Sequence, residues 1–458
     1  MSGTEKALQS QNPGHWLPRD RRIVAQWVAQ KAKEAGELPD DMLFEGGTPL
    51  DPSLAKFQET VDKSRYLHKL ANDMFTEVSN RYSKDPVGKC AIKSFSHFIT
   101  VLGYIMQSGP QFYDKAEPKT AMGLIGFPIN ALLDWPMGTF SGYEFFLQPE
   151  VNAALKEVLN SWGKFLVNPG SKASLDGWLS ETGQKLIAAK GNGGKTTHTF
   201  QELFICPDPS DKHLGFDSWD AFFVREFRDG VRPIEAPDDG IPDPQFPDST
   251  LVITNACESA PLQVKKDVRL FDAFYIKEQP YSLGTMLNCN ERTSQFVGGT
   301  VYQAFLSALS YHRWHAPVSG KVVAIEYVPG TYYSENWFEG VAGVRCPDKP
   351  DPAAPNYSQP YISAVATRGI IYIEAQNPNI GLMAIVFIGM AEVSSCEFTV
   401  KVGQDVTKGQ QLGMFHFGGS SHCMVFRPGV DIKFLNPPPW DPDNEKNFTV
   451  RSALAVVI

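Results

Sequence analysis

A run of small residues interrupts an apolar segment near the C-terminus, and the residue types there could do chemistry. The segment, GMFHFGGSSHCMVF, spans residues 413–426, and its small residues are Gly418, Gly419, Ser420 and Ser421. A strand gains stability from large side chains, so the lost packing needs an explanation. Three explanations remain open from the residues alone: a β-bulge, a serine hydrolase nucleophile, or a Gly-Ser bond that cleaves itself.

The Gly419–Ser420 bond suits self-cleavage because of the residue types on its two sides. Glycine has no Cβ to hinder attack on its carbonyl and tolerates unusual dihedral angles, and the serine hydroxyl can attack that carbonyl. A nearby base would take the serine proton. As a hydrolase nucleophile, Ser420 lacks the G-x-S-x-G sequence that displays such serines on a sharp turn.

Two histidines and a carboxylate could serve Ser420. His312 and His315 lie in YHRWH, directly before a turn that enters a strand, where catalytic groups are often displayed. We predict acid-base use and no metal, because no Cys, Asp or Glu follows at a zinc-like spacing. Glu258, in NACESAP, would complete a nucleophile, base and acid set. The alternative is structural: one histidine in the core, the other exposed, and Glu258 a solvated strand end.

The elements that must position these residues change character along the chain. Up to about residue 195, apolar residues recur at helical spacing, as in RRIVAQWVAQKAKEAG and in the segments behind Asp51 and Pro149. From residue 250 onward, short β-branched runs such as RGIIYIEAQ and GLMAIVFIGM predict strands. We therefore predict an α+β protein with a helical N-terminal domain, residues 1–195, and a β-rich catalytic domain, residues 196–458. The polar, Pro-rich stretch 336–360 is long enough to cover a site.

The composition argues against several classes of function. The 458 residues carry a net charge of −9 and no Lys/Arg-rich run, which argues against nucleic-acid binding. No apolar run is long enough to span a bilayer, and the N-terminus shows no targeting pattern, so we expect a cytoplasmic protein without an integral membrane segment. The seven cysteines include no C-x-x-C pair, which predicts reduced, mostly buried thiols.

Four segments resemble, in order and context, the motifs of the phosphatidylserine decarboxylase family. They are FFVREFRDGVRPI (222–234), YHRWHAPVSGKV (311–322), IVFIGMAEVSSCEF (385–398) and VTKGQQLGMFHFGGSSHCMVF (406–426). The resemblance covers about residues 200–458. Within the family the chain most resembles the soluble fungal amino-acid decarboxylases that act on L-tryptophan, which share the helical N-terminal region.

The resemblance implies a proenzyme, or zymogen, that makes its own cofactor. Ser420 would attack the Gly419 carbonyl, and an acyl shift followed by β-elimination would split the chain into residues 1–419 and 420–458, which stay associated. The new N-terminus would become a pyruvoyl group. Its ketone would form a Schiff base with the substrate amine and accept the electrons released as carbon dioxide leaves.

The family pattern also implies a role for each site residue. His315 matches the base of self-cleavage, and His312 matches the histidine of the decarboxylation step, where it would protonate the carbanion. Glu258 falls where phosphatidylserine decarboxylases place an aspartate that orients the base. The substitution keeps the charge but lengthens the side chain.

Departures from the family pattern favour a soluble amino acid over a lipid headgroup. The usual L-G-S-T is replaced by residues 418–421, the membrane-anchoring segment is missing, and a polar insertion follows Asn336. We predict pyruvoyl-dependent decarboxylation of an aromatic L-amino acid, tryptophan first, to the amine and carbon dioxide. The alternatives are a soluble phosphatidylserine decarboxylase, a serine hydrolase using Ser420, His315 and Glu258, and a binding domain that has lost catalysis.

Overall fold

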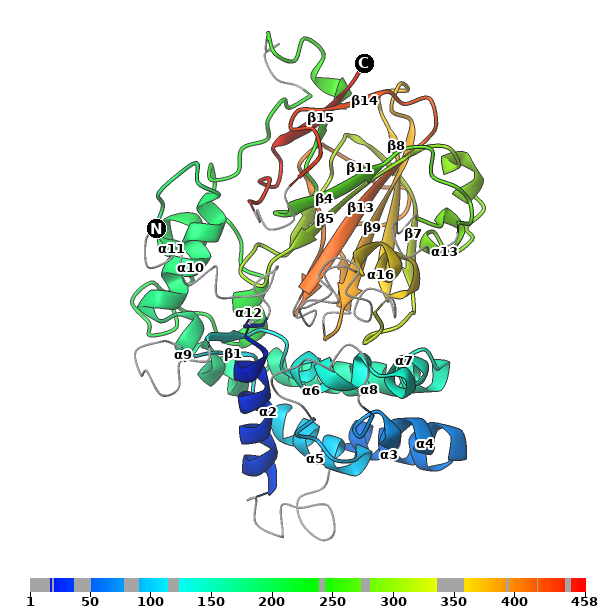
Figure 1. Cartoon of the computed structure of the whole chain (residues 1–458). Helices are drawn as coiled ribbons and strands as arrows, with labels where there is room; N and C mark the ends of the chain where they lie inside the picture. The colour runs from blue at the N-terminus through cyan, green and yellow to red at the C-terminus, as the bar shows by residue number, and fades with distance from the viewer. Residues whose placement is uncertain are drawn as a thin grey trace. The chain divides into compact units, whose positions relative to one another are not determined.

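The chain packs as two units, which we describe separately from a computed structural model (Figure 1). The described residues are 17–18, 20–36, 51–77, 90–113, 123–238, 244–272, 281–335, 358–392, 395–417, 419–440 and 446–458. The helical unit comprises Met1–Gly183, Asp211–Phe222 and Gly330–Ile362. The sheet unit comprises Gln184–Ser210, Phe223–Pro329 and Ser363–Ile458.

The helical unit is built from short helices and one small hairpin. Its elements are α2 (Arg21–Gly36), α3 (Pro52–Asp62), α4 (Arg65–Asp73), α5 (Phe95–Ile105), β1 (Gln111–Tyr113), β2 (Gly123–Ile125), α6 (Pro128–Met137), α7 (Phe140–Phe146), α8 (Pro149–Leu166), η3 (Pro169–Ser174) and α9 (Leu175–Trp178). Three helices cross the boundary between the units: α10 (Glu181–Asn192), α12 (Trp219–Phe223) and α16 (Gln359–Val365).

Capping residues explain where two of these helices begin. The Asp51 side chain accepts a hydrogen bond from the Ser53 amide at the start of α3, and Pro52 fits the first turn because its missing N–H has no helical partner there. Ser64 caps α4 in the same way by accepting from the Leu67 amide. The apolar pattern behind Asp51 therefore belongs to two helices, α3 and α4, with a break between Asp62 and Arg65.

The sheet unit holds most of the strands. Its elements are α11 (Phe200–Leu203), η4 (Ser249–Leu251), β3 (Val252–Thr254), β4 (Ala260–Lys265), α13 (Leu283–Met286), η5 (Thr293–Phe296), β5 (Thr300–Leu306), β6 (Arg313–His315), β7 (Gly320–Val328), β8 (Arg368–Ala375), β9 (Leu382–Met390), β10 (Ser395–Phe398), β11 (Asp405–Val406), β12 (Gln411–His416), β13 (Gly419–Phe426), β14 (Ile432–Phe434) and β15 (Ala453–Val457).

The described strands of the sheet unit form one large and two small antiparallel sheets. The large sheet has the order β11-β7-β8-β9-β13-β5-β4, and the small ones are β10-β12-β6 and β14-β15-β3. Strand β13 therefore lies inside the large sheet, between β9 and β5 (Figure 1). Strand β9 is buried along its whole length, which explains its almost uninterrupted run of apolar residues.

The two faces of β13 carry different residues because side chains alternate along a strand. Ser420 and His422 share one face, the Ser420 face, on which Phe387 of β9 lies opposite His422. Trp314 of β6 stacks on Phe387 with ring centroids 3.8 Å apart, so the small sheet β10-β12-β6 covers the Ser420 face at this point. Ser421 lies on the other face.

These features test the sequence-based expectations for the fold. The α+β class is confirmed, and so are the strands expected after residue 250. The domain boundary at residue 195 stays a prediction; the packing units group 211–222 and 330–362 with the helical N-terminal part. Residues 336–357 of the polar stretch lie outside the described residues.

Two further expectations concern the cysteines and the membrane-spanning segments. Six cysteines are described, all as free thiols: Cys90, Cys206, Cys257 and Cys423 are buried, Cys396 is half-buried and Cys289 is exposed. Among the described residues, we find no helix with the length and apolar character needed to cross a membrane.

Candidate active site

Ser420 is the second residue of β13 and is held on both sides by neighbouring strands. Its partners in register are Gly389 of β9 and Leu306 of β5. The side chain is buried at 1% exposure, and its hydroxyl has no hydrogen-bond partner among the described residues. A buried hydroxyl without a partner costs about 1–3 kcal/mol, so this serine is kept for a reason other than stability.

The chain bends sharply just before the Gly419–Ser420 bond. Phe417 has a left-handed backbone with φ +57, which is rare for a bulky residue and costs free energy. Its ring is 6.5 Å from that of Phe223, and Phe223 in turn stacks on His312 at 4.0 Å. Phe417 is thus packed, through Phe223, against one of the predicted site histidines.

His312 lies near the Ser420 end of β13. It is fully buried, and its carbonyl accepts a hydrogen bond from the Phe415 amide at 3.0 Å. Burial, and then the nearby Arg225 charge, hold the pKa of His312 well below its usual value, partly opposed by hydrogen bonding to the backbone of Ser307 and Ser310. Because Ser307 directly follows Leu306, which lies opposite Ser420, these contacts bring His312 close to the start of β13.

His315 is held as a neutral imidazole with a defined tautomer. Its Nδ1 lies 2.8 Å from the Gly409 carbonyl oxygen, and its Nε2 lies 3.0 Å from the Tyr311 hydroxyl. A carbonyl oxygen can only accept, so Nδ1 carries the hydrogen, and Nε2 accepts from the Tyr311 hydroxyl. Burial, and then the charge of Arg451, lower the pKa of His315 to about 3. The ring is therefore neutral at pH 7, and its Nε2 keeps an unprotonated lone pair.

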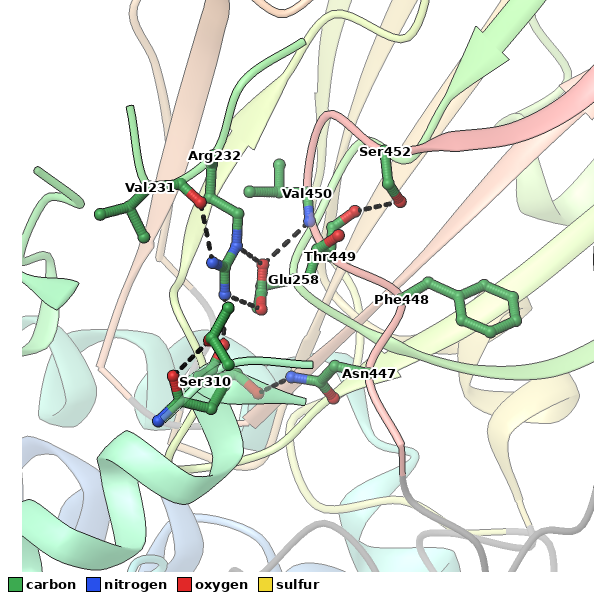
Figure 2. Close-up of polar contacts among 12 residues, drawn as sticks. Val231, Arg232, Glu258, Ser310, Asn447, Phe448, Thr449, Val450 and Ser452 are labelled. Atoms are coloured by element: carbon green, nitrogen blue, oxygen red, sulfur yellow. Dashed lines mark hydrogen bonds and ion pairs between the residues drawn. The ribbon is translucent and has the colours of Figure 1, made fainter. Parts of the chain in front are cut away.

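Glu258 is buried and bound by two groups other than the histidines (Figure 2). Arg232 donates to its carboxylate from Nε at 3.0 Å and from Nη2 at 2.7 Å, and the Val450 amide donates at 2.9 Å. The His315 amide donates to the Ala256 carbonyl at 2.9 Å, so the two backbone segments are neighbours. Within the described part of the chain, no hydrogen bond joins the Glu258 carboxylate to the His315 ring.

The structure thus brings the predicted residues into one region but does not join them as a hydrogen-bonded triad. Ser420 and His312 lie at one end of β13, whereas His315 and Glu258 are each bound by other residues. Their catalytic roles stay predictions.

The sequence reasoning overlooked His422. This histidine is fully buried on the Ser420 face, and neither ring nitrogen has a hydrogen-bond partner among the described residues. Burial lowers its pKa to about 3, and its ring centroid is 6.0 Å from that of Tyr302. The residue stands two positions after Ser420 in an expected strand, a spacing that predicts a shared face.

Comparison with known families identifies the family to which the chain belongs. Two family models match the chain, both described as phosphatidylserine decarboxylase, at residues 51–187 and 219–438. The first matched region covers helices α3 to α9, and the second includes Ser420, His312, His315 and Glu258. The chain belongs to the phosphatidylserine decarboxylase family, and it is therefore an enzyme of the carboxy-lyase class.

The most similar relatives are fungal decarboxylases. Decarboxylase iboD of Amanita muscaria is 41% identical over 72% of this chain and 91% of its own length. The L-tryptophan decarboxylase of Psilocybe cubensis is 32% identical over 90% of this chain and 88% of its own length, and that of Psilocybe cyanescens is 38% identical over 68% and 70%. Further relatives, 25 to 28% identical, are named phosphatidylserine decarboxylase proenzymes.

Proposed function

We propose that the chain cleaves itself between Gly419 and Ser420 and then decarboxylates a soluble aromatic L-amino acid, with tryptophan as the first candidate. One observation carries the proposal: Ser420 presents a buried hydroxyl without a described partner, directly after a glycine, at the start of an interior strand. This is the position of the serine in the family motif. Glycine at 419 leaves its carbonyl open to attack by that hydroxyl.

The residues around position 420 suit a pyruvoyl group formed from Ser420. The site is buried, and the Ser420 hydroxyl and both ring nitrogens of His422 have no hydrogen-bond partner among the described residues. A pyruvoyl group supplies a ketone that binds the substrate amine and accepts electrons as carbon dioxide leaves. The surrounding burial would exclude water from this reaction.

Each histidine has a distinct proposed task. His315 would hold the serine proton at Nε2, directly or through the Tyr311 hydroxyl that now donates to this atom. The Gly409 carbonyl fixes the ring in the tautomer that leaves Nε2 basic. His312, fixed by stacking on Phe223, would deliver a proton to the substrate carbon after carbon dioxide has left.

We propose that the two cleaved chains stay associated because of the sheet topology. Residues 420–458 contain most of β13, which is paired with β9 and β5 on both sides, and β15, which is paired with β3. Separation would break these three strand pairings and expose buried apolar strands. The cytoplasmic location stays a prediction.

The choice of an amino-acid substrate is supported by the relatives. Two of the most similar ones are named L-tryptophan decarboxylases and cover most of this chain. The relatives named phosphatidylserine decarboxylase proenzymes are less similar and match a smaller part of the chain. A soluble phosphatidylserine decarboxylase is therefore the weaker alternative.

Two measurements test the proposed function. Intact mass spectrometry should show two chains, the shorter beginning at residue 420, blocked to Edman degradation and lighter than the serine-ended peptide. A single chain of 50.7 kDa would contradict the proposal. Carbon dioxide release from a panel of L-amino acids and from phosphatidylserine vesicles then identifies the substrate, and release from the phospholipid alone would overturn the amino-acid assignment.

A further inference from the structure

Residues 447–453, which we call the C-terminal arm, bind the segments that carry Glu258 and His315. Asn447 donates from Nδ2 to the Ser310 hydroxyl at 3.0 Å (Figure 2). Phe448 and Ser259 exchange two backbone hydrogen bonds, at 2.8 and 3.2 Å. The Arg451 amide donates to the Asn255 carbonyl at 3.0 Å. The arm therefore lies along the backbone on both sides of Glu258.

Glu258 has its carboxylate occupied by the arm and by Arg232. The ion pair is almost fully buried, with side-chain exposures of 1% for Glu258 and 8% for Arg232. Such a pair contributes little net stability, but breaking it leaves an uncompensated buried charge. The pair also holds the Val450 amide, so its specific effect is to fix the arm in place.

Arg451, the next residue, reaches the surroundings of His315. Its Nε donates to the Gly409 carbonyl oxygen at 3.0 Å and lies 3.3 Å from His315 Nδ1, and its Nη1 donates to the Arg232 carbonyl at 3.3 Å. Its backbone is left-handed, with φ +68, a conformation that persists when surrounding contacts over-determine it. The bonds of the arm to Glu258 and Asn255 are such contacts.

We propose that Glu258 and Arg451 are positioning residues for His315, linked through the C-terminal arm. Glu258 fixes Val450, the arm then places Arg451 on the Gly409 carbonyl, and that carbonyl orients the His315 ring. The carboxylate thus acts on the histidine at a distance, through the backbone of another segment. This inference rests on the proposed role of His315 in self-cleavage.

A stack of side chains provides a second physical link between the ion pair and the histidine. The Arg232 guanidinium lies 4.2 Å from the centre of the Phe227 ring, Phe227 stacks on Tyr311 at 4.5 Å, and Tyr311 lies 5.8 Å from the His315 ring at an interplanar angle of 22°. Loss of the Glu258 charge would release Arg232 and loosen this stack as well. Both links predict that removal of Glu258 disturbs His315 without direct contact.

Arg451 belongs to residues 420–458, so the short chain would keep contributing to the His315 site after cleavage. His315 itself lies in the long chain. The His315 ring can therefore be oriented only when the C-terminal arm is correctly docked, both before and after the proposed cleavage.

A double-mutant cycle on self-cleavage tests the link between the two residues. The full chain is synthesised in a cell-free system, and the fraction cleaved is followed with time for wild type, Glu258→Gln, Arg451→Gln and the double variant. We expect each single change to slow cleavage on the order of 10- to 100-fold, as loss of an orienting partner does elsewhere. The double variant should be no slower than the slower single one, because both act through one arm.

The matched control is Glu235→Gln. Glu235 also accepts a hydrogen bond from an amide of the arm, that of Ala453 at 2.8 Å, but in an exposed position. We expect this variant to cleave at the wild-type rate. Unchanged rates for both single variants, or single effects that multiply in the double variant, would overturn the inference. An uncleaved wild-type chain would instead overturn the proposed function.

The pH dependence of the cleavage rate provides a second test, because a purely structural role of Arg451 would not shift it. This test can be applied even if Glu258→Gln does not fold. The charged and titratable groups that act on His315 are Arg451, Arg313 and Tyr311. Loss of Arg451 removes a charge that lowers the pKa of His315. The acid limb of the rate profile should therefore move to higher pH in Arg451→Gln and stay near its wild-type position in Arg451→Lys. An acid limb that does not move in Arg451→Gln would overturn the inference.

Discussion

Ser420 and Ser421 are adjacent residues of one strand, and they have opposite environments. The Ser421 hydroxyl accepts from Gln303 Nε2 at 3.5 Å, and Gln303 Oε1 accepts from the Tyr281 hydroxyl at 2.5 Å. The Ser420 hydroxyl faces the other side of the sheet and has no partner among the described residues. Two identical side chains thus differ in whether their hydroxyl groups have hydrogen-bond partners among the described residues.

The difference is the one expected between a structural serine, Ser421, and the reactive serine that we propose at position 420. A hydroxyl that donates and accepts within a network is fixed in place and is poorly available for attack. A buried hydroxyl without such bonds keeps its lone pairs available, at a cost to stability that the rest of the sheet must offset. The contrast predicts that changes on the two faces of β13 have different consequences.

The largest expected effect comes from Ser420→Ala. Without the hydroxyl there is no attack on the Gly419 carbonyl, so the variant should remain one chain and release no carbon dioxide from tryptophan. Intact mass and a carbon dioxide assay on the purified protein check this. Carbon dioxide release from the uncut variant would show that decarboxylation does not need the Ser420 hydroxyl. The different environments of the two serines would then not reflect a difference in chemical role.

Acid pH should reduce the free energy of unfolding of the sheet unit by several kcal/mol. His422 and His315 are both buried, and their pKa values are lowered to about 3. In the unfolded chain their pKa is about 6.5, so between these values the unfolded state binds protons that the folded state does not. The contribution of the two histidines to the free energy of unfolding is fully present above about pH 6.5. Below that pH, each histidine lowers the free energy of unfolding by up to about 1.4 kcal/mol per pH unit.

The uncut Ser420→Ala protein is suited to this measurement, because its unfolding is that of a single chain. Urea unfolding curves between pH 7 and pH 4 should show a steadily falling midpoint. The variant that also carries His422→Leu should fall less steeply over the same range. Equal slopes would mean that His422 is not buried as a neutral ring.

His422→Leu should separate cleavage from decarboxylation. The variant keeps Ser420 and should still be cut, but it loses the two ring nitrogens that share a face with the reactive position. We expect kcat/KM for the amino acid to fall about 100-fold, equivalent to about 2.7 kcal/mol. Cys423→Ala, a buried change on the opposite face of β13, is the matched control and should keep kcat/KM. Equal kcat/KM values for wild type and the His422 variant would exclude a substrate contact.

Ser421→Ala should have the smallest effect. The hydrogen bond from Gln303 is long, so its loss should reduce the free energy of unfolding by less than about 1 kcal/mol. Self-cleavage should proceed at the wild-type rate. Thermal melting and the cleavage time course check the two statements, and a strongly slowed cleavage would show that Ser421 takes part in the chemistry.

Elements with a regular apolar period could be predicted from the sequence. The helix behind Asp51 and the buried strand GLMAIVFIGM both appear where the pattern places them, because local periodicity reports which face is buried. The strand that begins at Gly419 was also expected from its apolar residues. Local pattern was sufficient for these elements.

The contacts of the site could not be predicted, because they join residues far apart in the chain. Glu258 is bound by Arg232, 26 residues away, and by Val450, 192 residues away. No spacing rule relates such residues, and the family pattern favoured a contact between Glu258 and His315 instead. His422, in contrast, could have been found, since it stands two positions after Ser420 in an expected strand.

The interior position of β13 has a consequence for the lifetime of the protein. If the chain is cut at the start of this strand as proposed, the folded protein consists of two pieces. Both pieces come from one continuous chain that folds first and is then cleaved once. After unfolding, the pieces would have to find each other in solution, and the severed peptide bond does not re-form. Loss of the folded state is then irreversible, so the rate of the first unfolding event, and not an equilibrium, sets how long each molecule works.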